Sequence, residues 1–442
     1  MSWRANPLVR WLANAICHVF YRVERVGAAP AAGALLLLPN HPNSLLDPAL
    51  VWAMADRDVR FLAKSTLFET PLRPLLAGAG AIPVYRKLDQ GVDTSKNVET
   101  FAAVSDALAA GDAVCLFPEG ISHSTGRLEP LRTGAARMAL AAERDGAAVA
   151  LVAVGLNFDR KATFRSRVTI VFGAPFSATD LVPGDDAALP AAARMLTARI
   201  AERMRQLLVE AEPNTDAALV DRVDRLYAAA RGRPHDAEER VARRRSIASG
   251  IDRLRATDPG RYEALLLRLR RYDARLRRFG LRDRHLDWQI SGGDALTFAV
   301  RELAFAVILL PLSALGFLVY FVPYHLTALI ARLVTRERDI VATAQVFTGV
   351  VVYGLWLGAV GAIAWSVAGT LSAWLTMAAL VPLSVLSLIA IERETAVLDA
   401  VRAWWHLRRA RHDTRERLRR HRTELADVLD EVQRWLEREV AR

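Results

Sequence analysis

The stretch from Leu35 to Pro48 reads LLLLPNHPNSLLDP, and it limits the folds open to this chain more than any other part of the sequence. Four consecutive leucines predict a fully buried strand, which ends at Pro39 because proline cannot donate to a sheet ladder. His41 then falls at the carboxyl end of the strand, where open α/β sheets bind their ligands, and Asp47 follows one turn later. A histidine and a carboxylate placed in this way are either a base with its orienting partner or a half-exposed histidine beside a capping turn.

Apolar runs alternate with helical patterns from Leu35 to Phe172. Alternation of this kind predicts an α/β domain whose mostly parallel sheet is flanked by helices, and we place this domain at residues 26–215. The expected strands are Leu35–Leu38, Val59–Ala63, Ala81–Val84, Ala113–Phe117, Val149–Leu156 and Val168–Phe172, and the clearest helices are Asn97–Ala110 and Leu131–Glu143.

Residues 1–25 predict an amphipathic N-terminal helix. Its apolar positions recur on one face and include Leu8, Trp11, Leu12 and Val19. Such a stripe fits a helix that lies in a membrane interface, and it fits equally well a helix that docks on the core of its own domain. The sequence leaves both interpretations open.

A membrane region is predicted at residues 301–392. Neither Leu303–Ala331 nor Ile340–Ile391 contains Asp, Glu, Lys or Arg. The second run is long enough for two helical spans of about 20 residues each, with a turn expected at Gly369–Thr370. Prolines interrupt the first run and favour one tilted or re-entrant segment. Arginines flank both runs, and if all of them stay in the cytoplasm, the second run crosses the membrane twice.

Charged helical segments are predicted on either side of this region. Residues 216–300 are rich in Ala, Arg, Glu and Leu and predict a helical insert, to which the sequence assigns no chemistry. Residues 393–442 predict a basic helical tail that either lies on lipid headgroups or pairs with the helices of the insert. We therefore expect an integral membrane protein with its α/β domain in the cytoplasm, at a bacterial inner membrane.

The net charge of the chain limits the classes of partner that it is expected to bind. The formal net charge is +11, which indicates an anionic partner. Because the basic residues accompany the uncharged runs, we expect an anionic phospholipid membrane and no nucleic acid. Arginine supplies nearly all of the positive charge, and the only lysines are Lys64, Lys87, Lys96 and Lys161. The chain has two cysteines and no Cys/His cluster, so we expect neither a disulfide nor a metal site.

Four further blocks give the opening motif a context. They are FLAKSTLF (Phe61–Phe68), GAIPVYR (Gly80–Arg86), FPEGISHS (Phe117–Ser124) and VAVGLNF (Val152–Phe158). Together with NHPNSLLDP, and in the same order and spacing, they resemble the glycerol-3-phosphate and lysophosphatidate acyltransferase family over roughly residues 30 to 180.

The chain departs from the family pattern at two points. Five residues separate His41 from Asp47 where the family usually has four, and the third block continues Glu-Gly-Ile-Ser where Glu-Gly-Thr-Arg is more common. Both departures resemble the branch of large membrane-bound glycerol-3-phosphate or dihydroxyacetone-phosphate acyltransferases. The extra residue makes the geometry of Asp47 less certain than that of His41.

The resemblance implies a catalytic mechanism. His41 would take the proton of an acceptor hydroxyl while that hydroxyl attacks an acyl thioester, and Asp47 would fix the imidazole tautomer and stabilise the imidazolium. Backbone N–H groups near Gly120 would stabilise the oxyanion.

The resemblance also implies a binding site for the phosphate of the acceptor. Arg86 would meet this phosphate, together with Lys64 and Arg132. Glu119 would organise the loop beside a nearby arginine, because a buried carboxylate without a partner is costly. His123 is expected to be a structural residue.

Several alternatives about the reaction remain open in the sequence. The first expectation is transfer to glycerol 3-phosphate from acyl-CoA or acyl carrier protein as co-substrate, without a cofactor. The nearest rival acceptor is lysophosphatidate or another lysophospholipid, and a different class of protein is an inactive lipid-binding scaffold. The acyl donor and the oligomeric state are not fixed by the sequence.

Overall fold

The computed structural model describes residues 3–85, 93–211, 216–232, 234, 236–287, 314–335, 337, 340–409 and 412–440. The chain divides into two compact units. The first contains residues 1–218, 234–248 and 336–343, and the second contains residues 219–233, 249–335 and 344–442. The first unit holds the β-sheet, and the described part of the second consists of helices and their connections.

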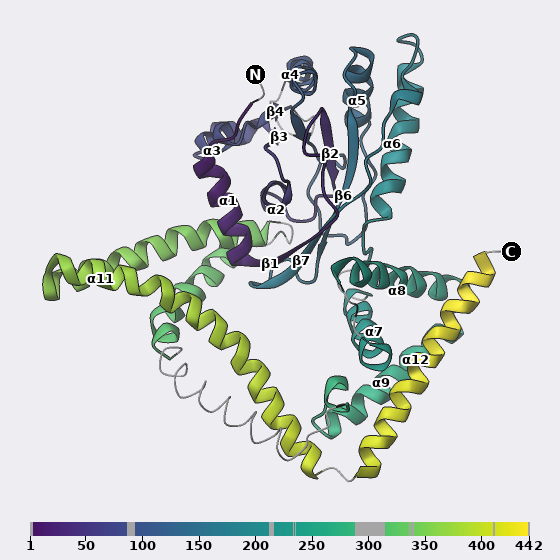
Figure 1. The fold of residues 1–442 in the computed structure, drawn as a ribbon, viewed down its shortest axis with the longest axis vertical. Coiled ribbons are helices and arrows are strands. Elements are labelled where there is room, and N and C mark those ends of the chain that lie inside the picture. The colour runs from purple at the N-terminus through teal and green to yellow at the C-terminus, as the bar shows by residue number, and fades with distance from the viewer. Residues whose placement is uncertain are drawn as a thin grey trace. The chain divides into compact units, whose positions relative to one another are not determined.

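A seven-stranded sheet forms the centre of the first unit (Figure 1). Its strands lie in the order β1-β7-β6-β2-β5-β3-β4, and all neighbours are parallel except β6 and β7. The mostly parallel sheet predicted from the sequence is therefore confirmed. The strands are β1 (Tyr21–Val26), β2 (Leu35–Pro39), β3 (Val59–Lys64), β4 (Ile82–Val84), β5 (Ala113–Cys115), β6 (Ala150–Phe158) and β7 (Ser166–Phe172).

Strand β1 is not among the strands predicted from the sequence. Its sequence, YRVERV, carries three charged residues and forms one edge of the sheet, where it pairs only with β7. An edge strand with one solvent-exposed face has no continuous apolar run. The apolar runs that identified the other six strands therefore have no counterpart in β1.

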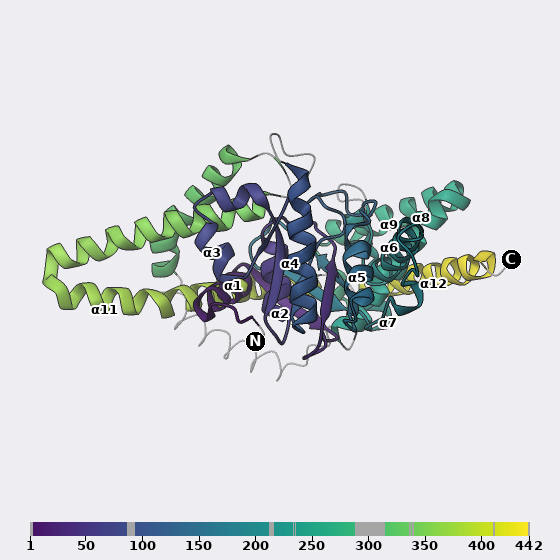
Figure 2. The ribbon, with the colours of Figure 1, turned by 90° about the horizontal axis from the view of Figure 1, so that it is seen from above.

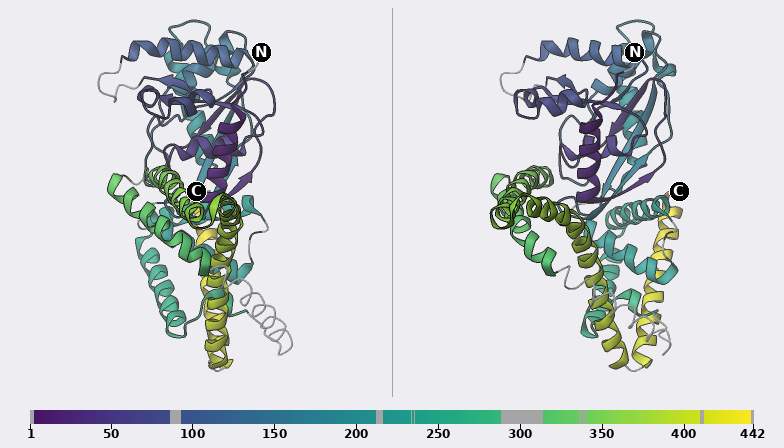
Figure 3. Two further views of the ribbon diagram at one scale, coloured as in Figure 1. Left: turned by 90° about the vertical axis from the view of Figure 1, so that its left-hand side faces the viewer. Right: turned by 60° about the vertical axis from the view of Figure 1, so that its left-hand side comes forward.

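Strand β2 lies near the middle of the sheet, and its four leucines are fully buried. Because successive side chains of a strand point to opposite faces, Leu36 and Leu38 pack in one cluster beneath three helices. These helices are α4 (Asn97–Ala109), α5 (Gly134–Arg144) and α6 (Leu189–Arg205), and α1 (Pro7–Phe20) and α2 (Leu46–Met54) cover the opposite face (Figures 1 and 3). Short helical segments complete the domain: η1 (Ser65–Glu69), α3 (Arg73–Gly78), η2 (Thr94–Lys96) and η3 (Thr179–Leu181).

Helix α1 divides the apolar stripe predicted for it between two environments. Cys17 and Phe20 are buried within the first unit, where α1 packs on α2. Leu8, Trp11 and Val19 remain 68%, 64% and 57% exposed. Only one edge of the stripe is therefore used for docking on the domain, and the rest forms an exposed apolar face.

The second unit is held together by ion pairs between helices. Its charged helices are α7 (Asp216–Arg231), part of α8 (Ala237–Thr257), α9 (Pro259–Arg278), η4 (Asp283–His285) and α12 (His412–Val440). Arg222 of α7 contacts Asp273 at 2.6 Å and Asp283 at 2.8 Å, and Arg231 contacts Asp430 of α12 at 2.7 Å. Helix α12, the basic tail, thus pairs with the helices of the insert.

Among the residues that the structure describes, two helices are long and apolar enough to cross a membrane: Ala314–Val334, and Val341–Ser387 within α11 (Val341–Arg409). Helix α11 leaves helical geometry at Ala368 and Gly369, and its two arms fold back on each other (Figure 2), with Met377 beside Gly361. The sequence places a turn at Gly369–Thr370. Residues 303–313 of the predicted tilted or re-entrant segment lie outside the described residues.

We predict that Leu36→Ala destabilises the first unit strongly. Leu36 is fully buried under α4–α6, so its truncation removes apolar contacts and leaves a cavity, at a cost of about 2–5 kcal/mol. Val98→Ala, at an exposed position of α4, is the matched control and should change stability by less than about 0.5 kcal/mol. Thermal unfolding of the detergent-solubilised chain measures both variants, and equal midpoints would contradict the assignment of β2 to the core.

Candidate active site

The loop after β2 carries the two residues expected to perform acid–base chemistry. It starts at Asn40, whose side-chain oxygen accepts from the N–H of Leu156 at 2.7 Å and whose amide donates to the carbonyl of Leu156 at 3.3 Å. These bonds fix the start of the loop to the neighbouring strand β6. The loop then turns at Ser44, which adopts a positive φ of 51°, and Asp47 lies in the first turn of α2.

His41 and Asp47 form a hydrogen-bonded dyad. The Nδ1 atom of His41 lies 2.8 Å from Oδ2 of Asp47, and the same oxygen accepts from the backbone N–H of Asn43 at 2.7 Å. Asp47 is fully buried, whereas the side chain of His41 is 19% exposed. Since Nδ1 faces the carboxylate, Nε2 lies on the other side of the ring, and it makes no hydrogen bond to the residues that the structure describes.

The imidazole of His41 is held on a second side by an aromatic ring. Its ring stacks on that of Phe117, with centroids 3.9 Å apart and an angle of 20° between the planes. The Asp47 hydrogen bond and this stack restrict both rotation and tilt of the imidazole. A base whose orientation is fixed before substrate arrives needs no reorganisation during proton transfer.

Two opposing effects act on the Asp47 carboxyl group. Complete burial raises its pKa, because the charged form is poorly solvated, whereas the hydrogen bonds from His41 and Asn43 lower it. Burial is the larger effect, so the pKa of Asp47 lies above its ordinary value. The negative charge that orients His41 is therefore held against an unfavourable environment.

Glu119 joins the loop that follows β5 to the dyad. One of its oxygens, Oε1, accepts from the backbone N–H of His41 at 2.7 Å. The other, Oε2, accepts from the N–H of Glu129 at 2.9 Å and contacts Nε2 of His123. Glu119 is almost fully buried, and the partner that the structure shows for it is His123. The arginine expected from the sequence is not among its described ion pairs.

His123 is consequently part of the site. Burial alone would lower its pKa, but the hydrogen bond and charge of Glu119 outweigh this effect and raise the pKa. Its Nδ1 atom lies 3.0 Å from the hydroxyl of Thr125, and its backbone N–H donates to the carbonyl of His41 at 3.1 Å. The residue therefore holds the two loops together, as its predicted structural role implies.

Two of the three basic residues expected to bind phosphate, Lys64 and Arg132, are among the described residues. Lys64 ends β3, at the same edge of the sheet as His41, because Phe61 is level with Cys115 and Cys115 with Leu37. The aliphatic part of the Arg132 side chain lies against the turn at Gly120. The backbone N–H of Arg132 donates to the carbonyl of Pro118 at 2.7 Å. Arg86 lies outside the described residues.

The backbone N–H of Gly120 takes part in a turn. It donates to the carbonyl of Phe117 at 3.0 Å and closes the turn of the second loop. An oxyanion donor would have to come from backbone N–H groups near Gly120 that point to the substrate, and this role stays a prediction. Gly120 itself has a φ of 74°, which explains the glycine at this position.

Sequence analysis also missed three residues that hold the site loops. Tyr21 and Asn43 are buried, and the Asn43 amide donates to the Tyr21 hydroxyl at 2.7 Å. Lys161, in the turn between β6 and β7, contacts both loops through its ammonium group. The scarcity of lysine was the one available signal for Lys161. Tyr21 lies in the strand whose existence the sequence did not reveal.

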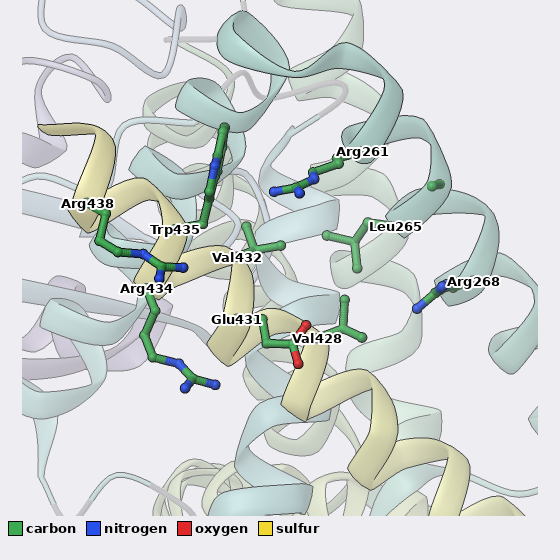
Figure 4. A pocket seen from close by; sticks show the side chains of 10 residues that line it. Arg261, Leu265, Arg268, Val428, Glu431, Val432, Arg434, Trp435 and Arg438 are labelled. Carbon is green, nitrogen blue, oxygen red and sulfur yellow. The ribbon is translucent and has the colours of Figure 1, made fainter. Parts of the chain in front are cut away.

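A separate groove lies between α9 and α12 of the second unit (Figure 4). Its volume is about 790 Å³, and it is lined by Arg261, Ala264, Leu265, Arg268, Val428, Glu431, Val432, Arg434, Trp435 and Arg438. The lining contains four arginines but no histidine, lysine, serine or cysteine. It includes none of the site residues predicted from the sequence, and the one carboxylate in its lining is that of Glu431.

The fold defines an α/β domain with a His–Asp dyad at the carboxyl edge of its sheet. Residues 20–156 match the family model described as Acyltransferase. Over 81 residues the chain is 41% identical to glycerol-3-phosphate O-acyltransferase 2 of Saccharomyces cerevisiae. The aligned stretch covers 18% of this chain and 11% of that protein. Over 134 residues it is 32% identical to the lyso-ornithine lipid O-acyltransferase of Brucella abortus. This stretch covers 30% of this chain and 47% of that protein.

Among solved structures, the 1-acyl-sn-glycerophosphate (LPA) acyltransferase PlsC of Thermotoga maritima is similar at 15% identity and a TM-score of 0.31, covering 44% of this chain and 78% of that chain. The first curated relatives are spanned over less than half of their own lengths. The family match lies within the sheet-containing unit. Residues 20–156 therefore match the acyltransferase family that the motifs resemble.

We predict that Asp47→Asn is at least as stable as the wild type at pH 7. The amide oxygen can replace Oδ2 as acceptor for His41 and Asn43, and the amide nitrogen replaces Oδ1, which has no hydrogen-bond partner among the described residues. Because the pKa of Asp47 is raised on folding, its ionised form costs folding free energy above that pKa. The variant no longer carries this cost.

The stability advantage of Asp47→Asn over the wild type should disappear in acid. Below the ordinary value of about 3.8, Asp47 is protonated in both the folded and the unfolded wild type, so the two midpoints should converge. Thermal unfolding between pH 3.5 and 7 measures this, with Asp106→Asn on the exposed face of α4 as control. A variant midpoint well below that of the wild type at pH 7 would contradict the prediction.

Proposed function

We propose that this chain is a membrane-bound O-acyltransferase that transfers a fatty acyl group from an acyl thioester to glycerol 3-phosphate, in phosphatidate biosynthesis. The observation that carries the proposal is the 2.8 Å contact between His41 and buried Asp47, within a domain of the acyltransferase family. The identity to a yeast glycerol-3-phosphate O-acyltransferase, although it covers few residues, supports this acceptor.

In the proposed reaction, Nε2 of His41 removes the proton from an acceptor hydroxyl. The hydroxyl oxygen attacks the thioester carbonyl carbon, and the tetrahedral intermediate collapses by breaking the carbon–sulfur bond. The thiolate leaves with the proton from the imidazolium, so the base is regenerated. A positioned base of this kind contributes about 10²–10⁴ in rate. Asp47 keeps the proton on Nδ1 and stabilises the imidazolium between the two transfers.

The acceptor needs a cationic site close to the base. Lys64 and Arg132 are our candidates among the described residues, because one ends a strand at the same sheet edge and the other lies against the Glu119–Gly120 turn. Arg86 follows β4 in the sequence and completes the proposed set. The acyl donor is acyl-CoA or acyl carrier protein, and the protein itself supplies all acid–base groups without a cofactor.

Membrane attachment is the second part of the proposal. Two helices have the length and apolar character of membrane spans, and the net charge of +11 suits an anionic phospholipid surface. The exposed apolar face of α1, which includes Trp11, fits the same surface. We propose that the acyltransferase domain lies on the cytoplasmic side of a bacterial inner membrane, where the flanking arginines are expected.

A lysophospholipid is the alternative acceptor. The Brucella abortus relative is named for a lyso-lipid substrate, and it matches over a longer stretch than the yeast relative does. The same dyad would serve either acceptor, because both present a hydroxyl to the base. An inactive lipid-binding protein is the remaining outcome, and a functioning dyad would exclude it.

We predict that the purified, detergent-solubilised protein acylates radiolabelled glycerol 3-phosphate from acyl-CoA, and that His41→Ala lowers the rate by about 10²–10⁴ because it removes the base. Lysophosphatidate supplied in parallel identifies the preferred acceptor from the product. His18→Ala, at an exposed histidine of α1, is the control and should retain the rate. Undiminished transfer by His41→Ala would eliminate the proposed base, and product from lysophosphatidate alone would favour the alternative acceptor.

A further inference from the structure

Lys161 contacts both loops of the active site. It lies in the seven-residue connection between β6 and β7, beyond residue 156, where the match to the acyltransferase family ends. Its Nζ donates to the carbonyl of Pro42 at 2.6 Å, and it also contacts the Ser124 hydroxyl and, at 3.5 Å, the carbonyl of His123. Pro42 follows His41 directly, and His123 is the partner of Glu119. One ammonium group thus touches backbone next to each functional histidine.

The turn that carries Lys161 is itself held in place. The N–H of Asp159 donates to the carbonyl of Arg167 at 3.0 Å, and the N–H of Arg165 donates to the carbonyl of Phe20 at 2.7 Å. The carbonyl of Lys161 accepts from the hydroxyl of Tyr21, which in turn accepts from the Asn43 amide. Backbone and side chain of Lys161 are therefore both tied to the loop that carries His41.

The geometry requires an ammonium group at this position. A lysine Nζ carries three N–H donors in a tetrahedral arrangement, which suits three acceptors on different sides, whereas the guanidinium of arginine directs its donors into one plane. The chain contains four lysines among 59 basic residues. A lysine at a contact of this kind is therefore not the default cation of this sequence.

The ammonium group also acts on the buried charge of the dyad. Lys161 is among the groups that lower the pKa of Asp47, against the effect of burial. The other titratable groups close to Asp47 are His41, Cys17, Cys115 and Tyr21. Burial raises the pKa of Cys17 to about 12 and also raises the pKa values of Cys115 and Tyr21, so these three are neutral at working pH. Besides His41, Lys161 is the group named here whose positive charge lowers the pKa of Asp47.

We propose that Lys161 is a positioning residue of the acyltransferase site, which locks the loop of His41 to the loop of Glu119 and places an ammonium group beside the backbone that follows His41. This inference rests on the proposed function, because the positioned group is the proposed base. Lys161 does not contact the reacting atoms itself. It acts through Pro42, His123 and the field at Asp47.

The test compares Lys161→Met with Lys161→Arg, and uses Lys96→Met as the matched control at an exposed lysine of the same domain. Lys161→Met should lower kcat by about 10²-fold, as expected when a base is misplaced by about 1 Å, with little change in the KM for the acceptor. Without the ammonium charge the Asp47 carboxylate protonates more readily. The acid limb of the pH–rate profile should therefore move to higher pH.

Lys161→Arg separates the two roles. It keeps the positive charge, so the acid limb should stay in place, but its planar donors cannot reproduce the three contacts, so kcat should still fall. Lys96→Met should leave both readouts unchanged. A purely structural role for Lys161 would lower kcat without moving the acid limb, and wild-type kcat with a wild-type acid limb in Lys161→Met would overturn the proposal.

Chemical restoration of the ammonium group keeps the test valid if Lys161→Met folds poorly. In Lys161→Cys, the new thiolate displaces bromide from 2-bromoethylamine and forms a thioether that ends in an ammonium group of nearly the original length. Cys17 and Cys115 are fully buried and have raised pKa values, so they react slowly. Alkylation should recover most of the lost kcat and return the acid limb. Lack of recovery, with a single adduct confirmed by mass spectrometry, would overturn the proposal.

Hydrogen exchange distinguishes this proposal from the proposed function. The amides of His41 and His123 donate across the two loops, and both should exchange faster in Lys161→Met than in Lys96→Met. If the wild type transfers no acyl group, the proposed function fails, and the exchange rates alone decide whether the loops are locked. Unchanged exchange in Lys161→Met would then overturn the locking role.

Discussion

The site depends on a carboxylate that is held without solvent. Asp47 is completely buried, yet its Oδ2 accepts from both the His41 ring and the Asn43 N–H, and no bond to its Oδ1 is made by the described residues. A buried anion is tolerated only where nearby donors and positive charge offset its lost hydration. The rest of the local structure, including the Ser44 turn and the position of α2, brings these groups to Asp47.

The sheet decides which groups can meet at this point. Strand β2 lies between β6 and β5, so the loops that follow these three parallel strands emerge at the same edge. The loop after β2 supplies the dyad, the loop after β5 supplies Glu119 and His123, and the turn after β6 supplies Lys161. Pro42 and Lys161, which are 119 positions apart in sequence, thus become neighbours because of strand order. Local sequence preferences determine only where each strand ends, and the order of the strands determines which loops meet.

The sequence was sufficient for the dyad and for most of the sheet, because both leave local signals. Six strands appear as continuous apolar runs, and His41 with Asp47 stands directly after the most apolar of them. Strand β1 left no such signal, and Tyr21, which it carries, was missed with it. The Glu119–His123 pairing spans four residues in sequence, but it depends on the turn geometry of the loop, so the sequence predicted an arginine in its place. The Lys161 contacts are set by strand order, which periodicity does not report.

The extra residue between His41 and Asp47 shows how the site tolerates a change in spacing. Sequence reasoning made Asp47 the less certain member of the pair, because one more residue shifts a helical side chain by about 100°. The structure keeps the 2.8 Å contact nevertheless. Ser44 takes a left-handed conformation with a φ of 51°, its N–H donates to the Ser122 hydroxyl at 3.0 Å, and α2 begins only at Leu46. The extra residue therefore does not prevent the contact between His41 and Asp47. The segment between β2 and α2 is fixed by bonds to Ser122, His123 and Lys161 of the neighbouring loops.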